Sequence, residues 1–487
     1  MTYLCCAESY WTIDGKRIFL IINYLKFMKN KTTMKAYEER RILEEAEMED
    51  SGLLPDQEPA LPVHLHSAIK EIVAPFPAEK KAAMAIISLA YLGTMAGNAR
   101  FLYRNSEEHY LGFECCLIGE QGIGKSAMTR LHKDLMSVLI SEDEKTRMKV
   151  DEYDDACNAC GENGAKPRDP HYGIRIMSPD TTKSAFFLNL KNLKGKRAII
   201  VAPEIDSLLK SGNWCCDRGA NERLMFDTEI GGQDTKCHNS TKARVRIAVN
   251  LAVSGTPVAV MRHYKNAEDG LVTRVAFCSF PETMNDDDEE KPRSEANRRK
   301  LLEIQKRLLD EPVGDVIKVP ALLRQQKEWY TEMKRLSDVS GNHSIETFRK
   351  RAAVIGFRAG CVLYLLDGHK ITRNALRFAR WVSEYVLYYQ MKYFGEKMNE
   401  SIEANAEIMR APVYLNNKNA WVFTSLPTVF TPLDVFQKYE ELGMKASGYR
   451  STIKRWKEAP NGWIFSLGDG RYGKTERGLA IQYKDAK

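Results

Sequence analysis

The strongest constraint in this sequence is a glycine-rich octapeptide, Gly119-Glu-Gln-Gly-Ile-Gly-Lys-Ser126, which fits the pattern GxxxxGKS. An apolar run at 113–118 precedes it, and a run with helical spacing at 127–136 follows it. This order predicts a buried strand, a tight turn and a helix that begins at the turn. Glycines let successive backbone N–H groups of such a turn face a ligand, and the helix N-terminus adds further donors. The segment is therefore suited to hold phosphate groups.

The octapeptide predicts a site for ATP and Mg²⁺. In this spacing Lys125 reaches the β- and γ-phosphates, and the hydroxyl of Ser126 ligates Mg²⁺. Contacts to the nucleotide are expected from Gly119, Gly122, Ile123, Gly124, Lys125, Ser126 and Ala127. The alternative is a glycine-rich turn that fits the pattern by chance, which the flanking strand and helix disfavour.

A second strand of the buried type, at 197–202, is followed by two carboxylates, Glu204 and Asp206. Ligands of parallel α/β sheets bind at the carboxyl ends of strands, so both side chains are expected near the phosphate loop. We interpret Glu204 as the catalytic carboxylate, and either Glu204 or Asp206 as a metal ligand beside Ser126. Pro203 stands where such sites usually carry a metal-binding aspartate. For Asp206, capping of the next helix is an equal alternative.

Three further segments complete an ordered series. A basic stretch with a double-glycine turn lies at 226–244, a third apolar strand at 245–253 ends in a polar tip, and Arg274 follows. This order resembles that of superfamily 3 helicases and related AAA+ replication ATPases. It is more closely similar to helicase-type P-loop proteins of unknown function that bacterial phages, plasmids and integrated mobile elements encode. The resemblance covers most of the chain between the N-terminal linker and the C-terminal domain, and only the phosphate loop follows the pattern strictly.

The resemblance implies roles for the tip of the third strand and for Arg274. At the tip, Thr256 or Ser254 would orient the attacking water and report the γ-phosphate, with Asn250 a weaker candidate. A Gly-Pro turn that closes a core strand is the alternative. Arg274 matches the arginine finger that such rings insert into the neighbouring subunit's site, and a surface ion pair is the alternative. The family also implies assembly of identical subunits into a hexamer-type ring.

The basic stretch matches a hairpin that lines the central channel of such rings. Lys236, His238 and Lys242 are then expected to bind the phosphates of single-stranded DNA, and ordinary solvated loop charges are the alternative. On a later helix, Arg351 or Arg358 is a candidate second nucleotide sensor. A cation on the helix surface is the favoured interpretation for both.

Composition favours a soluble globular protein, with 44% hydrophobic and 28% charged residues. The longest N-terminal apolar stretch, 18–25, is too short to cross a membrane and lacks a cleavage site, so we expect a cytoplasmic protein with no membrane partner. Eleven cysteines without a disulfide framework fit reduced thiols. A zinc site at the lone pair Cys157 and Cys160 is a weaker alternative, with further ligands from Cys215, Cys216, Cys237 or His238.

Shifts in composition predict four parts and an α/β fold class. An arm and linker at 1–60 precede a P-loop NTPase core at 61–285, which has a mostly parallel sheet and two N-terminal helices. A helical, lid-like domain at 286–408 follows an acidic run, and a winged helix-turn-helix ends the chain at 409–487. The helical patterns of the third part lie at 298–309, 322–336, 345–366 and 374–398.

The C-terminal part is the most basic. Its pattern is a capped helix from 431, a glycine stop, a basic helix at 448–457 and two short strands, which is typical of a winged helix-turn-helix. Residues 444–487 hold ten Lys or Arg against four Asp or Glu. We expect a duplex DNA contact from Arg450, Lys454, Arg455 and Lys457. The alternatives are a protein-docking module and a core role for Trp456.

Together these features predict an ATP-dependent DNA helicase or translocase of a mobile genetic element, with any primase on a separate chain. Single-stranded DNA would pass through the ring and duplex DNA would bind the winged helix. One alternative is a nucleotide-controlled DNA-binding switch or loader without unwinding activity. Another is a nucleotide-binding protein of mobile-element defence or regulation.

Overall fold

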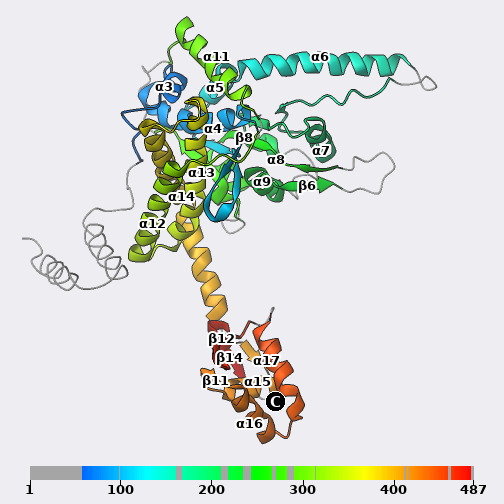
Figure 1. The fold of residues 1–487 in the computed structure, drawn as a ribbon, viewed down its shortest axis with the longest axis vertical. Helices are drawn as coiled ribbons and strands as arrows, with labels where there is room; N and C mark the ends of the chain where they lie inside the picture. Colours follow the sequence, from blue (N-terminus) through cyan, green and yellow to red (C-terminus); the bar gives the residue numbers. More distant parts are fainter. Residues whose placement is uncertain are drawn as a thin grey trace, which may run out of the picture. The chain divides into compact units, whose positions relative to one another are not determined.

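The computed structural model describes residues 58–483, except for residues 98, 161–166, 210–217, 234–242, 266–269, 282–289, 313, 411–412, 416 and 459–461 (Figure 1). The chain divides into two compact units, the first ending at Lys397 and the second beginning at Met398. The first unit holds a five-stranded sheet, and the second holds a smaller sheet of three strands. Among the helices of the described ranges, none combines the length and hydropathy that a membrane span requires.

The first unit is built on five parallel strands in the order β4-β5-β8-β3-β9. These strands are β4 (Ile176–Met177), β5 (Ala198–Ala202), β8 (Val249–Gly255), β3 (Glu114–Ile118) and β9 (Val275–Ser279). Every residue of β3, β8 and β9 is buried, as expected of parallel strands that are covered on both faces. The predicted α/β core with a mostly parallel sheet is therefore confirmed, and it is compatible with a P-loop-like core.

Two helices precede the sheet, as predicted: α3 (Ser67–Val73) and α4 (Ala78–Met95). Helix α4 lies against β3, β8 and β9 and is buried on nearly all sides. Gly93 is required where this helix meets the segment that leads into β3. A Cβ at Gly93 would come within 2.7 Å of the Leu111 carbonyl oxygen. The close approach holds α4 against the centre of the sheet.

Four long helices follow the sheet in the described chain: α11 (Glu295–Leu309), α12 (Pro320–Ser340), α13 (His343–Leu366) and α14 (Arg373–Arg410). A helix stands at each of the four stretches whose pattern predicts one. Helix α12 starts with a proline and ends before Gly341, whose φ of +66° suits a helix stop. Phe394 of α14 packs on Phe277 of β9, with ring centroids 5.0 Å apart. Helix α14 therefore shares the core of the sheet.

A hairpin of two strands belongs to this unit as well. Strands β6 (Ile230–Gln233) and β7 (Ala243–Arg246) pair antiparallel and form the hairpin predicted for the basic stretch. The tip of the hairpin, which carries Lys236, His238 and Lys242, lies outside the described residues.

Other described elements of the unit are β1 (Arg100–Leu102), η1 (Arg104–Ser106), β2 (Glu108–Tyr110), α5 (Ser126–Leu135), α7 (Lys183–Asn192), α8 (Asp206–Leu209), α9 (Arg218–Asp227), α10 (Pro257–His263) and η4 (Val272–Arg274).

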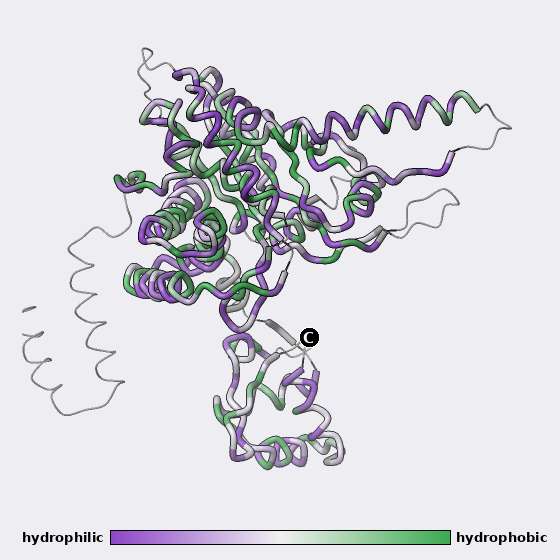
Figure 2. The backbone as a smooth tube through the Cα atoms, turned by 45° about the horizontal axis from the view of Figure 1, so that its top comes forward, coloured by the Kyte–Doolittle hydropathy of each residue, from purple (hydrophilic) through white to green (hydrophobic). Residues whose placement is uncertain are grey.

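Helix α6 (Ser137–Ala159) extends away from the sheet (Figure 1), and hydrophilic residues occupy most of its length (Figure 2). Cys157 and Cys160, near its end, are free thiols. Within the described ranges, no three His, Cys, Asp or Glu side chains come together in a group that could hold a metal ion. Residues 215, 216, 237 and 238, the other predicted zinc ligands, lie outside those ranges.

The second unit combines short helices with two small sheets. Its helical elements are α15 (Lys418–Ser425), α16 (Pro432–Glu441), η5 (Ala446–Gly448), α17 (Tyr449–Lys457) and α18 (Glu476–Leu479). Its strands are β10 (Val413–Leu415), β11 (Val429–Phe430), β12 (Ile464–Gly468), β13 (Arg471–Lys474) and β14 (Ile481–Tyr483). Strands β11, β13 and β12 form an antiparallel sheet with β13 in the centre, and β10 pairs with β14 in parallel.

In the second unit, a capping box marks the start of α16, and an aromatic core encloses one face of α17. Helix α16 begins with a capping box, in which the Asp434 carboxylate accepts from the Thr431 N–H at 2.7 Å. Trp456 of α17 is 2% exposed and packs on Phe423, with ring centroids 4.8 Å apart. The core role considered for Trp456 is therefore confirmed. The predicted succession of capped helix, turn, basic helix and two strands is also observed.

Candidate nucleotide site

The glycine-rich octapeptide forms the turn between β3 and α5. Gly122 and Gly124 adopt φ angles of +83° and +84°, which side chains with a Cβ rarely tolerate. A Cβ at Gly119 would come within 2.7 Å of Ile123 Cγ2. Lys125 Nζ donates to the carbonyl oxygens of Gly119 and Glu120, both at 2.8 Å. The lysine amine thus lies inside the curve of its own loop, at the start of α5.

Hydrogen bonds join the carboxyl ends of three adjacent strands. The Gly119 N–H, after β3, donates to the Gly255 carbonyl of β8 at 3.0 Å. The Ile205 N–H, after β5, donates to the Ser254 carbonyl of β8 at 2.7 Å, and the Ser254 hydroxyl donates to the Pro203 carbonyl. The structure therefore brings the glycine-rich loop and the segment that carries Glu204 to one edge of the sheet, with the tip of β8 between them.

The two predicted carboxylates at this edge differ in their surroundings. The Glu204 side chain is exposed, and no residue in the described ranges pairs with its carboxylate. Its backbone carbonyl accepts from the Ser207 N–H at 3.0 Å and so begins helix α8. Asp206 is half-buried, and its carboxylate lies 3.8 Å from Arg262 of α10. Glu204 is thus the more accessible acid, whereas Asp206 already faces a cation.

The polar residues of β8 and its tip make hydrogen bonds within the fold. Thr256 caps α10, because its hydroxyl oxygen accepts from the Ala259 N–H at 3.3 Å. The O–H proton of Thr256 is not used by this cap and can still be donated. Ser254 is buried and bonded to the β5 segment. Asn250 is wholly buried near the opposite end of β8, where its amide bonds Ala90, Thr94, Leu111, Phe113 and Arg197.

Three residues beside the loop were not anticipated from the sequence. Arg130 Nη1 donates to the Ser126 hydroxyl at 2.9 Å, and Lys80 of α4 lies against Gly124, where a Cβ would come within 2.9 Å of its Nζ. Both cations bind the carboxylate of Glu290. Arg130 follows Ser126 by four positions on one helix, so helical spacing alone predicts that contact. Lys80 and Glu290 lie 210 positions apart and carry no such local pattern.

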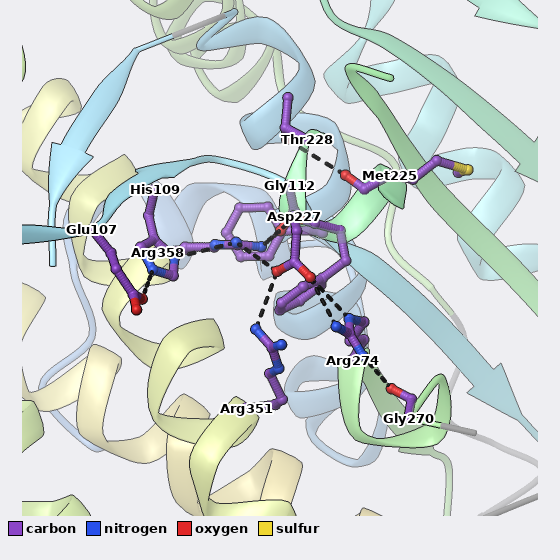
Figure 3. Close-up of polar contacts among 12 residues, drawn as sticks. Glu107, His109, Gly112, Met225, Asp227, Thr228, Gly270, Arg274, Arg351 and Arg358 are labelled. Carbon is purple, nitrogen blue, oxygen red and sulfur yellow. Dashed lines mark hydrogen bonds and ion pairs between the residues drawn. The ribbon is translucent and has the colours of Figure 1, made fainter. Parts of the chain in front are cut away.

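Arg274 lies at the opposite edge of the sheet from Lys125. It directly precedes β9, and Val275 is in register with Glu114, the first residue of β3. Its guanidinium donates to the Asp227 carboxylate at 2.9 Å and to the Gly270 carbonyl at 2.7 Å (Figure 3). The length of β3 and β9 therefore separates Arg274 from the glycine-rich loop of its own chain.

Asp227 is the centre of a cluster that includes Arg274, Arg351 and Arg358 (Figure 3). Arg351 Nη1 lies 3.1 Å from Asp227 Oδ1. Burial raises the pKa of Asp227, but Arg351 and Arg274 outweigh it and the net pKa is lowered. Asp227 falls within the basic stretch at 226–244, yet its pairing with these distant arginines has no local pattern.

Arg358 departs from the interpretation favoured by the sequence. It was expected on the surface of a helix, but it is 1% exposed. Its Nη1 donates to the carbonyl oxygens of Gly112 and Phe226 at 2.7 and 2.8 Å. Burial lowers the pKa of this guanidinium to about 10. The surface interpretation is wrong for Arg358 because the helix that carries it packs into the core.

Two more titratable groups are buried at this edge. Glu114 is 1% exposed, and within the described residues neither of its carboxylate oxygens has a hydrogen-bond partner. Burial, followed by the charge of Glu222, raises its pKa well above the usual value. Burial and Arg358 lower the pKa of His109 to about 3, so the ring is neutral and its Nδ1 accepts from Arg358. A protonated Glu114 and a neutral His109 reduce the charge buried here.

The predicted duplex contacts share one exposed surface of the second unit. Arg450, Lys454, Arg455 and Lys457 of α17 are all exposed, while Thr452, Ile453 and Trp456 face the core. Lys454 lies 3.7 Å from Glu458, and Arg455 donates to the Thr452 hydroxyl at 2.8 Å. Helical spacing alone therefore separates the cationic surface from the apolar one.

A scan against protein-family models found no match for this chain, and a search of curated proteins found none either.

Proposed function

We propose that this protein is an ATP-dependent DNA translocase or helicase that works as an oligomeric ring. The main support is the hydrogen-bonded edge that joins the glycine-rich loop to the β5 segment through Gly255 and Ser254. A nucleoside triphosphate on the loop would have an exposed carboxylate, Glu204, on the neighbouring segment. This pairing of a phosphate-binding lysine with an acid suits hydrolysis better than binding alone.

Each residue at this edge has a proposed part in hydrolysis. Lys125 would exchange its bonds to loop carbonyls for bonds to phosphate oxygens, and Glu204 would accept a proton from the attacking water. Thr256 would donate its O–H toward that water or the terminal phosphate. Oxygen donors of Ser126 and of Glu204 or Asp206 fit Mg²⁺, which when bound would neutralise phosphate charge.

The position of Arg274 supports hydrolysis that depends on assembly. Because Arg274 lies at the amino edge, a role for it in hydrolysis requires the site of a neighbouring subunit. Three arginines around Asp227 leave an excess of positive charge, so Arg351 and Arg358 would remain as partners of Asp227 when Arg274 engages a phosphate elsewhere. An arginine finger supplied in this way typically contributes about 10³ to 10⁵ in rate.

For the second unit we propose a winged helix-turn-helix that binds duplex DNA. The supporting features are the order of its elements, the three-stranded antiparallel sheet and the exposed cations of α17. Phosphate contacts from these side chains would make the affinity fall steeply as salt concentration rises. The cations at the tip of the β6–β7 hairpin would bind single-stranded DNA.

The deciding experiment measures ATP hydrolysis as a function of protein concentration, with and without single-stranded DNA. A ring motor predicts stimulation by DNA and a rate that rises more than linearly with concentration. Mixing Lys125→Ala with Arg274→Ala subunits should restore turnover that neither variant has alone, because one supplies the arginine and the other the intact loop. If Arg274→Ala hydrolyses ATP at the parental rate, the finger assignment is wrong.

A second candidate is a nucleotide-controlled DNA-binding switch. The contact of Arg130 with Ser126 favours it, because the predicted metal ligand is already engaged and turnover would be slow. A switch predicts slow hydrolysis that is indifferent to DNA, together with duplex affinity that differs between the ATP and ADP states. Strand-displacement assays separate this candidate from the helicase, since a switch produces no single strands.

A further inference from the structure

A cleft of about 660 Å³ is lined by Lys80 and Arg130, two residues that also contact the glycine-rich loop. Six basic and two acidic side chains line it, which leaves a formal excess of four positive charges. The lining residues are Pro75, Phe76, Lys80, Arg130, Lys133, Asp134, Glu290, Lys291, Pro292, Arg293 and Arg298. A cleft of this charge, adjacent to a phosphate-binding turn, is suited to an anion.

Two of these cations reach the loop itself. Lys80 Nζ lies against the backbone of Gly124, and its side chain is only 9% exposed. Arg130 comes from the second turn of α5 and donates to the Ser126 hydroxyl at 2.9 Å. Lys80 also lies over the ring of Phe280, 5.6 Å from its centroid, at the end of β9. The two cations thus border the loop on the side away from Glu204.

Both cations bind the same carboxylate. Glu290 Oε1 lies 3.2 Å from Lys80 Nζ, and Glu290 Oε2 lies 2.6 Å from Arg130 Nε. Burial raises the pKa of Glu290, but the hydrogen bonds and charges of Arg130 and Lys80 outweigh it and leave the pKa below its usual value. An ionised carboxylate therefore presents two oxygens to a lysine and an arginine, as a phosphate group would.

We propose that Lys80 and Arg130 form an anion subsite of the nucleotide site, and that Glu290 occupies this subsite until a phosphate of the nucleotide displaces it. The inference rests on the proposed ATP-binding function and adds a carboxylate of the chain that competes with the ligand. Displacement would also draw Arg130 away from the Ser126 hydroxyl and leave that oxygen available to Mg²⁺. Nucleotide binding and the state of Glu290 are then linked.

The test measures equilibrium affinity for ATP, ADP and pyrophosphate by calorimetry, in the presence of Mg²⁺. Glu290→Gln removes the competing charge and keeps the shape, so ATP and pyrophosphate should bind about fivefold more tightly, because the ligand no longer competes with two partly exposed ion pairs. Arg130→Gln removes a charged partner of the phosphate, so both ligands should bind roughly tenfold more weakly. Lys80→Gln should act in the same direction as Arg130→Gln.

Matched controls come from ion pairs outside the cleft. Glu332→Gln removes a carboxylate that binds Arg380 at 2.9 Å, and Lys300→Gln removes a cation that binds Glu71 at 2.5 Å. Both should keep the parental affinities. Thermal unfolding without ligand checks the folding of each variant. Lys80 is largely buried, so the proposal depends on the Glu290 and Arg130 variants if Lys80→Gln does not fold.

The outcomes separate this proposal from the proposed function. Parental affinity in both Glu290→Gln and Arg130→Gln, or weaker binding in Glu290→Gln, overturns the displacement mechanism while Lys125→Ala still loses nucleotide. If the parental protein binds no nucleotide, or Lys125→Ala binds it equally well, the proposed function itself fails. Tighter binding in Glu290→Gln with weaker binding in Arg130→Gln supports the subsite.

Discussion

Charged side chains at the two edges of the large sheet differ in how far they are exposed. At the carboxyl edge, Glu204 is exposed and Lys125 is half-buried, held by carbonyl groups of its own loop. At the amino edge, Arg197, Arg358 and Glu114 are each 1% exposed or less. The charges of Lys125 and Glu204 therefore remain available to a ligand, whereas Arg197, Arg358 and Glu114 are enclosed by the fold.

The amino edge also shows how buried charges are accommodated. Among the described residues, the Arg197 side chain bonds neutral groups, the Gly97 carbonyl, the Asn250 amide and the Thr228 hydroxyl, and burial lowers its pKa to about 9. Arginines tolerate this because their pKa starts so high that they remain charged at neutral pH. A charged side chain next to a strand end can therefore be wholly enclosed, so its position there does not by itself indicate a ligand site.

The most general loss, that of nucleotide binding itself, is expected from Lys125→Ala at the carboxyl edge. Loss of a charged donor to two phosphate groups should weaken ATP binding by roughly 100-fold or more. Thermal stability should hardly change, because the amine bonds only loop carbonyls that water can reach. Calorimetric titration and a melting curve test both halves. A large fall in stability with intact binding would reverse the contrast between the edges.

Glu204→Gln is the next test of the carboxyl edge. Removal of a general base should lower the rate of ATP hydrolysis by about 10² to 10⁴, with ATP affinity retained. Steady-state turnover and equilibrium binding are measured on the same preparation. Asp206→Asn, run in parallel, distinguishes the two acids, since loss of a metal ligand raises the Mg²⁺ requirement. An unchanged rate in Glu204→Gln would exclude that residue as the base.

Arg358→Met probes the amino edge. The substitution leaves the Gly112 and Phe226 carbonyl groups without their donor and weakens the compensation of Asp227, so unfolding free energy should fall by about 3 to 5 kcal/mol. Arg351→Met is the matched control, because Arg351 binds the same carboxylate from a more exposed position and should cost about 1 kcal/mol. Urea denaturation measures both. Equal losses would show that burial does not distinguish the two arginines.

Local periodicity accounts for what could be predicted from the sequence. Apolar runs predict β3 and β5, glycine and lysine spacing predicts the turn before α5, and helical patterns predict α11 to α14. The run at 245–253, predicted as one strand, instead takes in the end of β7 and most of β8, which belong to different sheets. The partners of single charges are a different matter. Asp227 meets Arg274 across 47 positions and Arg351 across 124. Such pairings depend on how elements pack, and a lone charge in a sequence does not indicate its partner.

The same limit explains the error at Arg358 and the two roles considered for Thr256. A cation in a helical pattern usually lies at the surface, and only the contacts of Arg358 with the Gly112 and Phe226 carbonyl groups show that it is enclosed. At Thr256 the sequence suggested a sensor or a turn, and the structure adds a helix cap. The cap and the sensor use different parts of one hydroxyl, so the cap does not exclude the sensor.

The smallest expected effect is a change in pH dependence for Glu114→Gln. The pKa of Glu114 is higher in the folded protein than in the unfolded chain. At pH values between these two pKa values, Glu114 is ionised in the unfolded chain and protonated in the folded protein. The stability that protonated Glu114 contributes is full below the unfolded pKa and declines as pH rises through the folded pKa. Glutamine cannot ionise, so the free energy of unfolding of the variant should rise relative to that of the parent as pH rises.

Urea denaturation from about pH 4.5 to about pH 8 measures this gain, because a glutamate in an unfolded chain has a pKa of about 4.3. The free energy of unfolding of the variant should rise steadily relative to that of the parent across this range. Glu303→Gln, at an exposed position on α11, should show no such trend. A constant difference across this range would mean that Glu114 is ionised in the folded protein, and that the amino edge holds more negative charge than its burial suggests.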